Sequence, residues 1–164
     1  MQAKLVHAER ILVSITAAAM MLSASSVART QTVVRDGSVE AEPGPAANFT
    51  GRVAVRMLTD PTPPGQAGTA MVSFSPGARS NWHTHPAGQT LYVTAGCGWT
   101  QEEGGAVARI CRGDTVYVKP GVRHWHGATA TTGMSHLAIS ETLDGKNVTW
   151  LAPVTAAQFS GPAR

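Results

Sequence analysis

The feature that most constrains the fold is a series of short apolar segments, each ended by a proline or glycine turn. Val53, Val55 and Met57 alternate with other residues before the Pro-Thr-Pro-Pro-Gly break at residues 61–65. Such alternation is typical of a half-buried strand, and turns at this spacing favour short strands over long helices. Further strands are predicted at 69–75, 91–95, 107–111, 115–118, 136–141 and 148–150. The chain is therefore predicted to be all-β, a sandwich or barrel, with a short helix expected only at 154–159.

Two segments precede the predicted domain. In the first 28 residues, Lys4 and Arg10 come before an uncharged stretch that ends in Ser26-Val27-Ala28, the pattern of a secretory signal peptide. An uncleaved anchor is the alternative, but Ser and Thr residues within the stretch weaken it as a membrane span. We therefore expect an exported protein, periplasmic or secreted, without a membrane association after cleavage. Residues 29–47 are polar and carry Pro and Gly, so they are predicted to be a flexible lead-in to one domain at 48–160.

The two cysteines lie on either side of a predicted hairpin turn. Cys97 and Cys111 are nearly equidistant from the turn at residues 102–105, so they are expected to face each other in neighbouring strands. In an oxidising compartment such a pair can form a disulfide. Two small buried apolar residues are an equally good interpretation.

Histidine is the residue type with an unusual distribution. Five of the six histidines lie between residues 83 and 136, and four of them form the pairs His83-Thr84-His85 and His124-Trp125-His126. Alternate residues of a strand share a face, so each pair directs two imidazoles the same way. A single histidine is more often a surface or hydrogen-bonded residue. Five grouped in a chain with only 14% charged residues indicate a site for a divalent transition metal.

The overall charge excludes one class of partner. The net charge of +3 comes from Lys and Arg residues that are scattered along the chain, and no two of them are adjacent. A nucleic-acid-binding domain needs a basic patch or stripe, so no nucleic-acid partner is expected.

The spacing of the histidines resembles the two sequence motifs of the cupin family. The first is Gly77-(x5)-His83-x-His85-(x3)-Gln89-(x6)-Gly96, with Gln where most cupins have Glu, and the second is Gly113-(x5)-Lys119-Pro120-Gly121-(x2)-His124. The resemblance implies a compact single-domain cupin, a small antiparallel β-barrel or jelly roll with a metal ion at its centre.

Longer stretches of the chain resemble bacterial cupin hydroxynitrile lyases. The clearest are Trp82-His83-Thr84-His85-Pro86, Thr94-Ala95-Gly96-Cys97-Gly98-Trp99 and His124-Trp125-His126-Gly127-Ala128. The resemblance covers about residues 47–160. It implies one divalent ion, manganese, held by His83, His85, Gln89 and His124, with iron, nickel and zinc as alternatives. Ser140 departs from that group, because it occupies a position facing the pocket where such a lyase has Gln.

The ligand set and its neighbours suggest the chemistry. Gln in place of Glu keeps an oxygen donor but removes a negative charge, so a bound divalent ion remains a stronger Lewis acid. The resemblance implies His126, His136 and Ser80 as pocket residues. We take His136 as the candidate base, because an ordinary imidazole pKa near ~6.5 suits proton transfer near neutral pH. His126 is expected to orient the bound group or to support the ligands, and a packed core histidine is the alternative for His136.

Several apolar residues are expected to shape the pocket around an aryl group. They are Ala70, Val72, Trp82 and Trp125, although core packing explains the two tryptophans equally well.

Three functions follow from this interpretation. The first is a metal-dependent carbon–carbon lyase that cleaves or forms α-hydroxynitriles (cyanohydrins) such as mandelonitrile. The second is an iron-dependent cupin dioxygenase or other oxidoreductase, and the third is a non-catalytic cupin that binds a small molecule. In each case the partner is a small molecule, and the family resemblance makes a homo-oligomer plausible.

Overall fold

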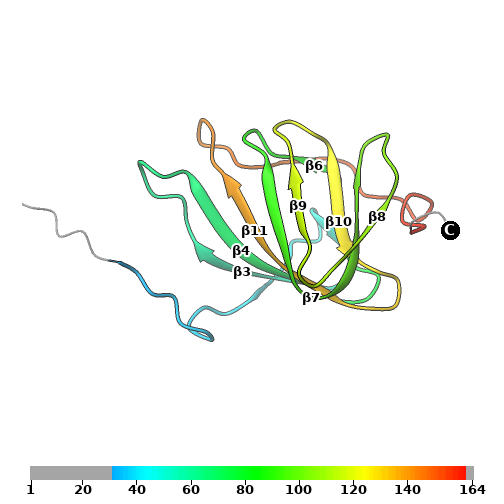
Figure 1. Cartoon of the computed structure of the whole chain (residues 1–164), viewed down its shortest axis with the longest axis horizontal. Helices are drawn as coiled ribbons and strands as arrows, with labels where there is room; N and C mark the ends of the chain where they lie inside the picture. Colours follow the sequence, from blue (N-terminus) through cyan, green and yellow to red (C-terminus); the bar gives the residue numbers. More distant parts are fainter. Residues whose placement is uncertain (1–30, 162–164) are drawn as a thin grey trace, which may run out of the picture. The chain divides into compact units, whose positions relative to one another are not determined.

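The computed structural model describes residues 31–161, and in this range the chain consists of strands and turns (Figure 1). The predicted signal peptide lies outside the described residues. Within 31–161 there is no helix of the length and apolar character that crossing a membrane requires. The strands are β1 (Glu42–Pro43), β2 (Phe49–Thr50), β3 (Val53–Thr59), β4 (Ala67–Phe74), β5 (Arg79–Ser80), β6 (His83–Thr84), β7 (Gln89–Glu102), β8 (Ala108–Cys111), β9 (Thr115–Val118), β10 (His124–Ala128), β11 (Met134–Glu141) and β12 (Thr149–Trp150).

The strands form one curled antiparallel sheet that closes into a half-barrel (Figure 1). Its order is β1-β3-β4-β11-β7-β10-β5-β2, while β8 and β9 pair with β7, and β6 pairs with both β10 and β12. Strands distant in sequence are neighbours, so β11 lies between β4 and β7 along its full length. The all-β, single-domain architecture expected from the sequence is confirmed.

The fourteen-residue strand β7 forms the corner between the two halves of the sheet. Its first part pairs with β9 and β11, and its second part, from Cys97 onward, pairs with β8 and β10. The register with β11 shifts just before this corner, and Gly96 has a φ of 67°, which glycine adopts without strain. A Cβ atom on Gly98 would lie 2.2 Å from the carbonyl oxygen of Gly127. The bend predicted at Gly96 and Gly98 is therefore present, but the strand continues through it.

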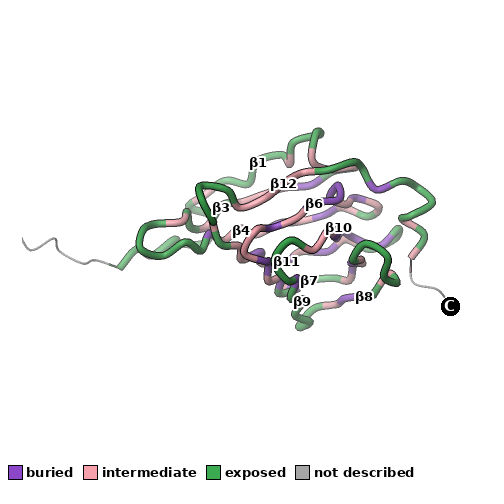
Figure 2. The backbone as a smooth tube through the Cα atoms, turned by 90° about the horizontal axis from the view of Figure 1, so that it is seen from above, coloured by how far each residue is buried: buried purple, intermediate pink, exposed green. Residues whose placement is uncertain are grey.

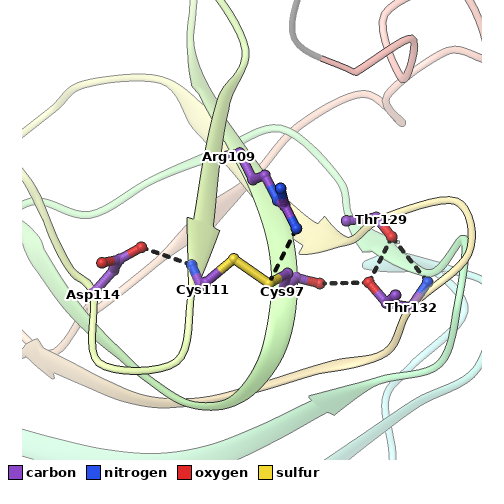
Figure 3. The surroundings of a disulfide bond; sticks show 6 residues. All are labelled: Cys97, Arg109, Cys111, Asp114, Thr129 and Thr132. Atoms are coloured by element: carbon purple, nitrogen blue, oxygen red, sulfur yellow. Dashed lines mark hydrogen bonds between the residues drawn. A yellow bond between two sulfur atoms is a disulfide. The ribbon is translucent and has the colours of Figure 1, made fainter.

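The two cysteines form a disulfide between β7 and β8. Cys97 and Cys111 are direct cross-strand partners, and the Arg109 side chain donates a hydrogen bond to the Cys97 sulfur (Figure 3). The Asp114 carboxylate accepts a hydrogen bond from the Cys111 amide, which closes the turn between β8 and β9. Of the two interpretations of this pair, the structure supports the disulfide.

Among the described residues, two apolar clusters hold the sheet together. Figure 2 shows that the longest exposed stretches lie in the connections between strands, whereas buried residues lie mostly within the strands. The larger cluster fills the barrel and includes Val72, Phe74, Leu91 and Val93. The smaller one consists of buried aromatic and aliphatic residues on the opposite side of β10, namely Trp82, Trp125 and Val154, with Trp99, Val107 and Phe159 packed against them. Because β10 is covered on both faces, all five of its residues are buried.

The ends of the domain differ from the sequence prediction. Residues 154–159 form a turn in place of the expected helix, with one i to i+4 hydrogen bond from the Phe159 amide to the Thr155 carbonyl. In a helix this short, too few hydrogen bonds form to offset the unfavourable free energy of its first turn. The segment 29–47, expected to be a flexible lead-in, contains β1, which pairs with β3 through Glu42 and Pro43. A two-residue strand has no detectable sequence pattern.

Candidate metal centre and cavity

Three histidines converge inside the half-barrel. His83 comes from β6, His85 follows two residues later, and His124 lies opposite His83 at the start of β10. One ring nitrogen from each lies within 4.8 Å of one from each of the others, and all three residues are buried. Their convergence depends on the pairing of β6 with β10, which joins segments 40 residues apart.

Each of these rings is oriented by a backbone carbonyl. The Nδ1–H groups of His83 and His124 donate to the carbonyl oxygens of Asn81 and Val122, at 2.9 Å and 3.0 Å, and His85 donates to that of Asn147. A carbonyl oxygen can only accept, so each Nδ1 carries the hydrogen and the Nε2 lone pair is free. Metal-binding histidines are typically held by such a hydrogen bond on the other ring nitrogen.

Gln89, at the start of β7, completes the candidate ligand set. Its Oε1 lies 3.0 Å from His124 Nε2, with the amide oriented as in the structure. Both atoms then present lone pairs, because the His124 hydrogen is on Nδ1, and His85 Nε2 is buried without a hydrogen-bond partner. Imidazole nitrogens and an amide oxygen are donors that divalent transition metals accept, so the residues fit a metal ion.

Burial keeps the three rings neutral. It lowers the pKa of His83 well below its ordinary value, and the nearby His124 lowers it further. Burial also lowers the pKa of His85, to about 4, and that of His124. Neutral imidazole is the form that binds metals, so little proton release is needed at neutral pH.

His126 and His136 form a second pair beside the candidate ligands. Their ring centroids are 4.8 Å apart, and His126 is 5.2 Å from the His83 ring. Both side chains are buried, and all four of their ring nitrogens lack a hydrogen-bond partner within the described residues. Phe74 packs against both rings. Unpaired buried nitrogens are costly, so this pair is suited to a polar ligand.

The burial of His136 changes the pKa on which its expected role as a base was argued. Burial lowers its pKa to about 4, whereas the sequence argument used an ordinary imidazole value. Burial lowers the pKa of His126 well below 6.5 as well, and the neighbouring His136 adds to this effect. At neutral pH both rings are therefore uncharged and each has one nitrogen available to accept a proton.

Four of the five histidines, all except His124, line one end of a cavity of about 160 Å³. The polar end is formed by His83, His85, Gln89, His126, His136 and Ser140, and the remainder is largely apolar, with Phe49, Val55, Met57, Ala70, Val72, Ala138 and Trp150. Ala70, Val72 and Ser140 thus line the cavity beside the candidate ligands. A cavity with a polar end and an apolar body suits a small substrate with one polar group.

Three residues expected in the pocket lie elsewhere, and one of them, Trp82, is buried in the smaller cluster. Trp125 points to the opposite face of β10 from its neighbours His124 and His126, packs in the smaller cluster, and donates a hydrogen bond to Gln101. Strand alternation requires this, because Trp125 lies between two inward-facing residues. Ser80 is fully buried behind the cavity, where its hydroxyl accepts a hydrogen bond from the His126 amide.

Trp150 and Asn147 are among the contributors to the site that were missed in the sequence. The Trp150 ring lies 4.9 Å from that of His83 and lines the cavity, and its register opposite His83 arises from the pairing of β12 with β6. Asn147 orients His85 through its backbone carbonyl. The role of Asn147 could not be predicted from the sequence, because any residue type has a backbone carbonyl. Trp150 could have been noticed, because it is an aromatic residue in a predicted strand.

Comparisons with known proteins agree with this geometry. Residues 70–140 match the family described as cupin domain. The chain is 54% identical over 127 residues to an (R)-mandelonitrile lyase from Granulicella tundricola, an alignment that covers 77% of this chain and 97% of that protein. The matched span includes most of the described residues.

Solved structures of proteins with different names have the same fold. A cupin-like protein from Thermotoga maritima superposes with a TM-score of 0.70 at 39% identity, covering 73% of this chain and 91% of that one. The polyketide cyclase RemF from Streptomyces resistomycificus has a TM-score of 0.64 at 16% identity, with 79% and 91% covered. The second likeness concerns the fold alone, because one fold hosts unrelated reactions.

Proposed function

The chain belongs to the cupin family, and from this premise and the geometry of its site we propose that it is a metal-dependent lyase acting on α-hydroxynitriles. The reaction splits an α-hydroxynitrile such as mandelonitrile into an aldehyde and hydrogen cyanide, or joins the two. The similarity to a mandelonitrile lyase supports the reaction class, and the converging donor atoms support the metal dependence.

The observation that carries the proposal is the convergence of one ring nitrogen from each of His83, His85 and His124 within 4.8 Å of one another, with Gln89 Oε1 3.0 Å from His124 Nε2. These residues would hold one divalent ion, and we propose manganese, as the sequence resemblance implies. When bound, such an ion supplies positive charge that acidifies a nearby hydroxyl group. The four protein donors are uncharged, so they do not diminish that charge.

His136 is the proposed proton acceptor. Its ring is neutral at pH 7 because burial lowers its pKa to about 4, and both ring nitrogens lie unpaired beside the cavity. In the cleavage direction, the hydroxyl proton moves to His136, the carbonyl double bond forms, and the carbon–carbon bond electrons leave with cyanide. A weakly basic imidazole returns its proton readily, which completes hydrogen cyanide and restores the neutral ring.

The other cavity residues would position the substrate. His126 is next to His136 and can donate a hydrogen bond to the nitrile or to its departing form. Ala70, Val72 and Ala138 would surround the substituent of the substrate and exclude water from it. Exclusion of water strengthens the polar contacts at the reacting carbon.

We further propose that the protein is exported to an oxidising compartment. The disulfide between Cys97 and Cys111 supports this, since such bonds are rare in reducing cytosol. Mass spectrometry of the mature N-terminus, on protein from its native host, tests the expected cleavage after residue 28.

The experiment that tests the function follows benzaldehyde release from mandelonitrile by manganese-loaded protein at several pH values. Oxygen uptake with phenolic substrates is measured in parallel, because uptake without aldehyde release would favour the dioxygenase alternative. Absence of aldehyde above the non-enzymatic background would reject the lyase.

Two variants test the assigned residues. His124→Ala is expected to lose metal, so a stoichiometric metal content by mass spectrometry would contradict the ligand set. His136→Leu is expected to keep the metal and lose about 10²-fold or more in kcat, the usual contribution of a positioned base. An unchanged rate would exclude His136 as the acceptor.

A further inference from the structure

An apolar groove adjoins the candidate catalytic cavity. It has a volume of about 540 Å³ and lies between the lead-in segment, β3 and β12. Four residues line both the groove and the cavity: Phe49, Val55, Met57 and Trp150. The two spaces therefore adjoin each other along these four side chains.

The far wall of the groove is an ordered part of the fold. Glu42 and Pro43 pair with β3, and the Gly44 amide donates a hydrogen bond to the Val53 carbonyl at 2.8 Å. The following turn is closed by the Phe49 amide, which donates to the Pro45 carbonyl. Because backbone hydrogen bonds hold this segment, its side chains present a fixed surface to a ligand.

Aromatic rings connect the metal-site end of the cavity to the groove. The Trp150 ring lies 4.9 Å from the His83 ring on one side and 5.4 Å from the Phe49 ring on the other. Flat rings of this kind contact aromatic and alkyl groups favourably, with edge-to-face geometry at such distances. A substituent that leaves the reacting carbon toward Trp150 would therefore reach the groove along an apolar surface.

The volumes set the size of the substituent. The cavity of about 160 Å³ is close to the roughly 150 Å³ that accommodates benzene in an apolar protein cavity. A phenyl group thus nearly fills it, and any longer substituent has to continue into the groove. The groove is more than large enough for a second ring.

The lining of the groove sets the charge of the substituent. Val39, Pro43 and Pro45 contribute apolar surface, whereas Glu40 and Glu42 are exposed carboxylates that also line it. A negatively charged tail would be repelled by both carboxylates, and a neutral apolar tail would not.

We propose that this groove is a second substrate subsite, which selects α-hydroxynitriles and aldehydes with a neutral apolar substituent longer than one phenyl ring. The proposal rests on the lyase function and specifies its substrate class. Mandelonitrile then fills only the inner cavity, while a biphenyl or long alkyl analogue occupies both spaces.

The test measures binding separately from turnover. Isothermal titration of the manganese-loaded protein compares benzaldehyde with biphenyl-4-carbaldehyde, which differ by one ring. The longer aldehyde is expected to bind about tenfold more tightly or better, which is the gain from burying roughly 60 Å² of apolar surface. The same ratio is measured as kcat/KM for the two corresponding cyanohydrins.

Two variants of Val39 target the groove without touching the inner cavity. Val39→Trp would occupy part of the groove, and Val39→Asp would replace apolar lining by a hydrated carboxylate. Both are expected to reduce the preference for the longer aldehyde by about tenfold. Val33→Trp is the matched control, because Val33 is 56% exposed and lines neither space.

The outcomes separate the two proposals. Equal affinities of the unaltered protein for both aldehydes, or a preference that survives both Val39 variants, would overturn the subsite. A preference that depends on Val39, found in a protein that turns over no cyanohydrin, would reject the lyase and support the groove as an aldehyde-binding subsite.

Discussion

Because its histidines are buried, the metal-free protein is expected to lose stability in acid. The contribution of one of them, His136, can be measured. Burial lowers the pKa of His136 to about 4 in the folded protein, against about 6.5 in an unfolded chain. Well above pH 6.5 the ring is neutral in both states. As the pH falls from 6.5 toward 4, the unfolded chain takes up a proton that the folded protein does not, so stability is lost through this window.

The size of the effect follows from the two pKa values. Between pH 7.5 and pH 4.5, a ring that titrates at 6.5 when unfolded and at about 4 when folded removes roughly 2 to 3 kcal/mol from the free energy of unfolding. The ring is almost completely enclosed, so solvent screening does not reduce this figure appreciably. His85, which also has a pKa of about 4, adds to the total loss but not to the difference made by a change at His136.

The assay is urea unfolding of the protein and of His136→Leu at pH 7.5 and 4.5, with a chelator present. The chelator is needed because metal binding has a pH dependence of its own. The variant is expected to lose about 2 to 3 kcal/mol less than the unaltered protein between the two pH values. Leu137→Ala is the control, because this non-titrating neighbour points to the other face of β11 and should lower stability equally at both pH values.

Equal losses in the unaltered protein and in His136→Leu would refute this reasoning. That result would mean that the ring takes up its proton in the folded protein as readily as in the unfolded chain. The low pKa of His136 in the folded protein would then be wrong, and at pH 7 the ring would be a mixture of neutral and charged forms.

Two further predictions concern the corner formed by β7. Replacing Cys97 and Cys111 by Ser is expected to lower the free energy of unfolding, measured in urea, by about 3 kcal/mol, because the disulfide closes a loop of about 15 residues in the unfolded chain. A reducing agent should reproduce this loss in the unaltered protein and leave the variant unchanged. Equal stabilities of the two proteins would contradict the prediction. Gly98→Ala is expected to lower the free energy of unfolding by roughly 1 to 3 kcal/mol, because the added Cβ would lie 2.2 Å from the Gly127 carbonyl oxygen and 2.3 Å from the Met134 sulfur. The control is Gly105→Ala, where the nearest atom to the added Cβ is 3.3 Å away. Similar thermal midpoints of the two variants would contradict the proposed crowding.

Much of the site could be anticipated from local patterns. The spacing of His83 and His85 predicted that both would face the same way, and both are buried in the cavity together. Strand alternation also separates Trp125 from His124 and His126, so its placement outside the cavity follows from the rule that placed the histidines inside. From the sequence alone, a core position and a pocket position are equally good interpretations of this tryptophan.

Other features had no local signal. The lead-in strand β1 is two residues long and depends on its pairing with β3, so the groove that it borders was not foreseen. The role of Asn147 lies in its backbone carbonyl, which any residue type possesses. The pKa of His136 depends on how completely other strands cover it, which is set by β4 and β7 on either side of β11.

The sequence by itself determined the class of fold and the identity of the donor groups, because alternation, turn residues and histidine spacing act over a few residues. Only the tertiary structure decided which donors face one another and how deeply they lie. Pairing of β6 with β10 brings His83 opposite His124, and the curling of the sheet removes His126 and His136 from water. Register and burial arise from contacts between segments that are distant in the sequence. These contacts bring the imidazole rings together and lower their pKa values.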